Sequence, residues 1–140
     1  MLSFRRHTGL HILLPLFLCV MALASSCSES KRDEAKVVGN AAKLYYEYLL
    51  QGKYEAYVDG FYRPDSIPDG YRSQLIDNAK MFVGSQKEEH QGIKEINVGH
   101  VKVDTTQHIA NVFLILTYGD KGKEQVVVPM IQKKGMWLMR

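Results

Sequence analysis

The spacing of apolar residues changes at Ile93, and this change constrains the fold of the chain more than any other feature. Between residues 37 and 86, apolar side chains recur at steps of three and four, which is typical of helices that bury one face. From Ile93 onward they recur at steps of two, which is typical of strands. This order predicts an α+β domain, with three N-terminal helices packed on a four-stranded antiparallel sheet.

Three segments are predicted to be helical. The first covers residues 37–50 and ends at Gly52, which suits a left-handed helix cap. A short second helix ends at Gly60, and the third runs from the loop at residues 63–70 to about Gln86. Ser66 and Asp69 have the spacing of a capping box for the third helix. The residues expected to face inward are Val37, Ala41, Leu44, Tyr45, Tyr48, Leu49, Tyr54, Tyr57, Val58, Phe61, Tyr71, Leu75, Ala79, Phe82 and Val83.

The predicted strands cover residues 93–104, 108–118, 124–132 and 136–140. In the first strand, Ile96 and Val98 have one parity, whereas Val101 and Val103 have the other. A β-bulge at Gly99 would bring both pairs to the same face of the sheet. The second strand is apolar on both faces, which predicts a central strand that is covered on both sides.

The N-terminal segment predicts export. Arg5 and Arg6 precede an apolar run at residues 11–24, and small polar residues lead to Cys27, which together describe a secretory signal. Ala24-Ser25-Ser26 before Cys27 resembles the lipobox of bacterial lipoproteins. The resemblance implies cleavage before Cys27, lipidation of its thiol, and a protein anchored to the outer membrane on its periplasmic or surface-exposed face. A plain cleaved signal and an uncleaved anchor are the alternatives.

This interpretation divides the chain into a lipoprotein signal peptide at residues 1–26, a lipidated tether at 27–36 and a folded domain at 37–140. Arg5 and Arg6 account for two of the 18 basic residues, so 16 remain beside 15 acidic residues, a net charge of +1. That balance and the export signal argue against a nucleic-acid partner. Cys19 leaves with the signal, so we expect neither a disulfide nor a cysteine metal site in the domain. The histidines have no metal-ligand spacing, and no cofactor or metal is expected.

Two local patterns resemble the small lipoprotein members of the nuclear transport factor 2-like (cystatin-like α+β) superfamily, many of which have unknown function. One is Ala42-Lys-Leu-Tyr-Tyr-Glu-Tyr-Leu-Leu-Gln-Gly-Lys-Tyr-Glu-Ala56, in which one helix ends at Gly and another begins at once. The other is the closing Lys133-Lys-Gly-Met-Trp-Leu. The resemblance implies a curved sheet wrapped against the long helix, a cone-shaped cavity between them, and pairing of two copies through the outer sheet face.

Some members of that superfamily are isomerases or dehydratases, which use a carboxylate or His base with an aromatic hydroxyl inside the cone. The strand acids Glu95, Asp104 and Glu124 lie near strand ends, so a buried carboxylate base is not evident. His100 is the best titratable candidate for a base or polar anchor, and the alternative, which the sequence favours, is a His on the solvated side of the first strand. The candidate pocket-lining residues are Tyr45, Tyr48, Tyr57, Phe61, His100 and Trp137, for which core packing is the alternative.

The sequence therefore predicts a non-catalytic, lipid-anchored cell-envelope protein. It would bind a small ligand, a peptide or an envelope partner through the cone or the sheet face. The first alternative is a small isomerase- or dehydratase-like enzyme that uses His100 and a Tyr. The second is a structural accessory whose sheet face mediates assembly.

Overall fold

The computed structural model describes the backbone of residues 13–140 and the side chains from residue 29 onward. The chain divides into two units, with the boundary between Asp33 and Glu34. Arg5 and Arg6 of the predicted signal lie outside the described residues, and so does the side chain of Cys27. Within the described part of the chain, no helix is long and apolar enough to cross a membrane.

The three helices are α1 at Leu13–Leu50, α2 at Tyr54–Asp59 and α3 at Asp69–His90. Gly52 follows α1 with φ = +70°, which confirms the predicted left-handed cap. The predicted capping box before α3 is wrong, because α3 begins after Pro68 without a side-chain hydrogen bond at its cap. The predicted end of α3 near Gln86 is also wrong, because the helix continues to His90 and stops where Gln91 is left-handed.

The buried face of α1 differs from the predicted one by about one residue. Val38, Ala42 and Leu49 are buried, whereas Val37 and Leu44 are 59% and 44% exposed. The contact between α1 and the sheet at Gly39 gives the physical reason. A Cβ atom at Gly39 would lie 3.1 Å from Val98 Cγ1 and 3.2 Å from Val101 Cγ2, so this side of α1 lies against the sheet.

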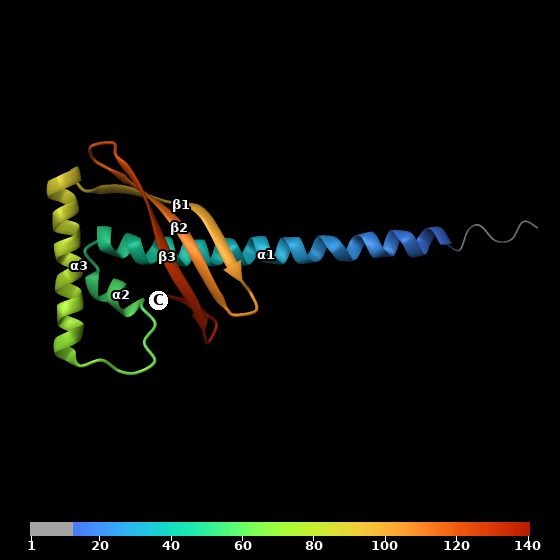
Figure 1. Cartoon of the computed structure of the whole chain (residues 1–140), viewed down its shortest axis with the longest axis horizontal. Coiled ribbons are helices and arrows are strands. Elements are labelled where there is room, and N and C mark those ends of the chain that lie inside the picture. Colours follow the sequence, from blue (N-terminus) through green and yellow to red (C-terminus); the bar gives the residue numbers. More distant parts are fainter. Residues whose placement is uncertain (1–12) are drawn as a thin grey trace, which may run out of the picture. The chain divides into compact units, whose positions relative to one another are not determined.

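The sheet contains β1 at Ile93–Asp104, β2 at Ile109–Tyr118, β3 at Lys123–Lys133 and β4 at Met136–Met139. All neighbours are antiparallel, in the order β1-β2-β3-β4. Figure 1 shows the C-terminal part of α1 running across the sheet and α3 lying at one end of it. The predicted α+β architecture, three helices packed on a four-stranded antiparallel sheet, is confirmed.

The predicted bulge at Gly99 is confirmed by the register of β1 on β2. The register shifts between Val98 and His100, so that Val98 pairs with Leu114 and Val101 pairs with Val112. Both valines therefore lie on the buried face of the sheet. The φ angle of Gly99 is not positive, so the bulge itself does not require glycine.

The core lies between α1 and the inner face of the sheet. Its members come from α1 and from β1 to β4, and they include Val38, Ala42, Ile96, Val112, Leu114, Leu116, Val128, Met130, Trp137 and Met139. The outer face of β2, with Phe113 and Ile115, is only half-buried, and neighbouring Val127 is 50% exposed. Pairing of two copies through this outer face stays a prediction.

The segment after α2 is bonded to the sheet through β4. Met139 N–H donates to the Gly60 carbonyl oxygen (2.9 Å), and Tyr62 N–H donates to the Met139 carbonyl oxygen (2.7 Å). A Cβ atom at Gly60 would overlap the Tyr45 ring, so glycine permits this close approach. These contacts fix the start of the loop that follows, at residues 61–63.

Candidate binding pocket

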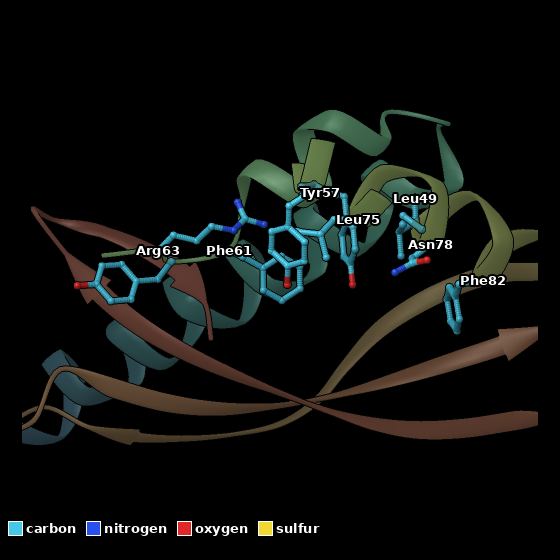
Figure 2. Close-up of a pocket in the computed structure, with 11 residues that line it drawn as sticks. Leu49, Tyr57, Phe61, Arg63, Leu75, Asn78 and Phe82 are labelled. Carbon is cyan, nitrogen blue, oxygen red and sulfur yellow. The ribbon is translucent and has the colours of Figure 1, made fainter. Parts of the chain in front are cut away.

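A pocket of about 400 Å³ lies between α2, the segment after it, and α3 (Figure 2). This volume falls within the range of about 300–1,000 Å³ that is common for small-molecule sites. The described residues that line it come from the end of α1, from α2 and its following segment, and from α3, and none of them comes from the sheet. They are Leu49, Tyr57, Val58, Phe61, Tyr62, Arg63, Tyr71, Leu75, Asn78, Ala79 and Phe82.

The lining combines an apolar body with a few polar groups at its margin. Figure 2 shows Arg63 at one end of the pocket and Phe82 at the other, with Tyr57, Phe61 and Leu75 between them. Among the described lining residues, Arg63 alone carries a charge. The pocket is thus polarised along its length, with its cation at one end only.

The spacing of residues on α2 and α3 builds the walls. Tyr57 and Phe61 are four residues apart and meet edge to face, with ring centroids 5.3 Å apart. The Tyr46 ring of α1 also meets the Tyr57 ring edge to face, with ring centroids 6.0 Å apart. On α3, steps of three and four bring one set of side chains to the pocket: Tyr71, Leu75, Asn78, Ala79 and Phe82.

An ion pair joins the two helical walls. Arg72 Nε donates to Asp59 Oδ1 (3.0 Å), and the second guanidinium nitrogen donates to Oδ2 (2.8 Å). These hydrogen bonds lower the pKa of Asp59, and the charge of Arg63 lowers it slightly further. Asp59 is therefore satisfied by Arg72. Arg63 makes no hydrogen bond or ion pair with any residue in the described part of the chain.

The Tyr57 hydroxyl is the most perturbed polar group in the lining. Burial raises the pKa of Tyr57 well above its ordinary value, and the neighbouring Tyr46 raises it further. The hydroxyl is accordingly protonated at neutral pH, and it makes no hydrogen bond with a described residue. It is available as a donor to a molecule in the pocket.

Of the six predicted pocket residues, the structure brings Tyr57 and Phe61 together in this pocket. Tyr45 lies against the sheet, where its hydroxyl donates to the Trp137 carbonyl oxygen (3.0 Å), and Trp137 itself is 5% exposed in the core. The Tyr48 ring meets the Tyr45 ring edge to face, with centroids 6.2 Å apart.

His100 lies apart from this pocket, exposed on β1. Its ring centroid is 5.8 Å from that of Phe113, and it borders a separate depression together with Gly39 and Asn40 of α1. No tyrosine borders that depression. The structure therefore does not bring His100 and a tyrosine hydroxyl together at one site among the described residues.

The space between α1 and the sheet is occupied by the core side chains, so the pocket lies outside the predicted cone. Sequence reasoning missed Arg63, Asn78 and the α3 residues as pocket-lining. The available signal is the stripe of Tyr71, Leu75, Ala79 and Phe82, which the sequence predicts to face inward. Tyr71 and Phe82 are 50% and 39% exposed, because α3 packs on α2 rather than across the sheet.

A polar cluster at the C-terminal end of α3 links this helix to the sheet. His90 Nδ1 lies 3.0 Å from Asp120 Oδ2, and the His90 ring stacks on Tyr118 with centroids 4.7 Å apart. Burial and a hydrogen bond to Glu124 raise the pKa of Tyr118 to about 12. A hydrogen bond from the Gly122 N–H, and then the contact with His90, lower the pKa of Asp120. The cluster joins α3 to the turn between β2 and β3.

Among the described residues, no group of three or more His, Cys, Asp or Glu side chains could hold a metal.

Comparison with known proteins places the fold. No family model matches the chain, and no curated protein matches it. A solved structure from Campylobacter jejuni, described as a "Putative NTF2-like transpeptidase", is 13% identical, covers 71% of this chain and 94% of its own, and superimposes with a TM-score of 0.60. A protein of unknown function from Bacteroides thetaiotaomicron is 15% identical over 86% of this chain and 95% of its own, with a TM-score of 0.36. The first match shows that the domain has an NTF2-like α+β fold, as the resemblance to the nuclear transport factor 2-like superfamily predicted.

Proposed function

We propose that this chain is a lipid-anchored cell-envelope protein that binds a small ligand between α2 and α3. The observation that carries the binding proposal is the pocket of about 400 Å³, which combines apolar walls with polar side chains that make no hydrogen bond to a described residue. The anchor rests on the signal-like segment that ends at Cys27. The two parts are tested separately.

The binding proposal predicts that the protein retains a small molecule when it is purified from its own host. Native mass spectrometry of the full chain should show an added mass. Asn78→Trp should abolish it, because Asn78 is an exposed lining residue and an indole there would fill the pocket. Ser73→Trp is the matched control, because Ser73 is exposed on α3 and absent from the lining. An unbound wild-type protein, or an added mass that survives Asn78→Trp, would contradict the proposal.

The anchor proposal predicts that Cys27→Ala abolishes both labelled-palmitate incorporation and recovery of the protein with membranes. Alanine has no thiol to carry the lipid, so both readouts should change together. A Cys27→Ala protein that still incorporates palmitate would show that the lipid is attached elsewhere.

A further inference from the structure

We infer that the ligand of the helical pocket is an amphipathic carboxylate whose anionic head binds Arg63 and whose apolar body extends toward Phe82. This inference rests on the proposed ligand-binding function and adds the chemical class of the ligand. It depends on three features of the pocket: its unpaired cation, its polarity along its length, and its volume.

The cation is the first feature. Arg63 is half-buried at the pocket margin and has no ion-pair partner in the described part of the chain. The nearby carboxylate of Asp59 already accepts two hydrogen bonds from Arg72, at 3.0 and 2.8 Å. A guanidinium is a planar fork of donors that matches a carboxylate in two parallel hydrogen bonds. Arg63 therefore acts on Asp59 only through its charge, and its guanidinium donors make no hydrogen bond within the described part of the chain.

The direction of the pocket is the second feature. Arg63 lies at one end, and away from it the walls are mainly apolar, with Leu75, Leu49 and Phe82. The Tyr57 hydroxyl lies between the two ends, as Figure 2 shows, and can donate a further hydrogen bond near the head. Since Arg63 is the single charged group among the described lining residues, one negative charge balances it. A head with several charges would leave the excess unpaired.

The volume is the third feature. About 400 Å³ is the space of roughly a dozen water molecules at ~30 Å³ each. A carboxylate with a phenyl group or a short acyl chain fits this space, whereas a long lipid or a folded peptide does not. 4-Phenylbutyrate is a suitable probe, and 4-phenylbutyramide is its neutral match in shape and size.

The test measures binding of both probes to the full-length lipoprotein in lipid nanodiscs by equilibrium dialysis, with empty nanodiscs subtracted. We expect 4-phenylbutyrate to bind at least tenfold more tightly than the amide. Arg63→Gln should remove that preference. Lys80→Gln should keep it, because this variant loses the same charge from an exposed position of α3 that does not line the pocket. Asn78→Trp should block both probes.

The other outcomes overturn the inference in distinguishable ways. If both probes bind equally and Asn78→Trp blocks both, the binding function stands and the anionic ligand class is wrong. If neither probe binds, the ligand class is wrong, and the mass retained by the purified protein decides the binding function. If Asn78→Trp leaves probe binding intact, the pocket is not the site and both proposals fail. If Lys80→Gln removes the preference for 4-phenylbutyrate as fully as Arg63→Gln does, the selectivity comes from the overall electrostatic potential of the protein. Arg63 then does not recognise the carboxylate.

Discussion

A variant that lacks Phe113 is expected to lose about 3 kcal/mol or more of its free energy of unfolding, which is a large part of the roughly 5–15 kcal/mol typical of a domain. Side chains alternate between faces along β2, so removing one paired residue inverts the face of everything on one side of the deletion. Either Ala110 and Val112 or Leu114 and Leu116 would then turn away from the core. Leu114 and Leu116 are both 0% exposed in the native sheet, and so is Val112, so the loss of either pair is substantial.

Deletion of Gly99 is the matched control, because Gly99 is the residue of β1 that has no partner on β2 at the bulge. Without it, Val98 still pairs with Leu114 and Val101 still pairs with Val112, so both valines keep their face of the sheet. We therefore expect the Gly99 deletion to cost about 1 kcal/mol. Urea denaturation followed by circular dichroism measures both variants. Equal costs for the two deletions would show that the lost residue matters by itself, and that the face of the side chains does not.

The fold was predictable because its main determinants are local and periodic. The change of spacing at Ile93 separates helices from strands, and the inverted parity around Gly99 locates the bulge. Both patterns involve residues that are close together in the sequence, and neither depends on which distant segment packs against them. The register of β1 on β2 follows directly from them.

The rotation of α1 was not predictable in the same way. Apolar residues occur on two overlapping stripes, one with Val37 and Leu44 and the other with Val38 and Ala42. Both satisfy helical periodicity, and hydropathy alone does not choose between them. The close approach of Gly39 to Val98 and Val101 decides the matter, and this is a tertiary contact between residues about sixty positions apart.

The candidate site was predictable only in part, for a related reason. Tyr57 and Phe61 were identified because tyrosine-rich helical turns favour pockets and cores alike. Which of those two environments an aromatic residue enters depends on where α3 packs. Arg63 had no sequence signal of its own, because an arginine beside a loop is usually solvated, and its lack of an ion-pair partner emerges only when Arg72 is seen to occupy Asp59.

Trp137→Ala is expected to lower the free energy of unfolding by about 3–5 kcal/mol, the usual cost of truncating a buried aromatic residue to alanine. Trp137 is 5% exposed on β4 and belongs to the core between the sheet and α1. Met136→Ala is the matched control, because the neighbouring Met136 is 60% exposed, and it should cost less than about 0.5 kcal/mol. Thermal and urea denaturation followed by circular dichroism give both values.

The same variant also separates the two roles that sequence allows for Trp137. If Trp137 is only a core residue, Trp137→Ala should reduce ligand binding only by raising the fraction of unfolded protein. The reason is that β4 bonds to Gly60 and Tyr62 through its backbone but contributes no side chain to the pocket lining. Binding of 4-phenylbutyrate at a temperature where Trp137→Ala remains folded should therefore match the wild type within about twofold, a difference of roughly 0.4 kcal/mol. A stable Trp137→Ala protein that has lost the ligand would instead place the indole in the binding site, and would move that site from the helices to the sheet.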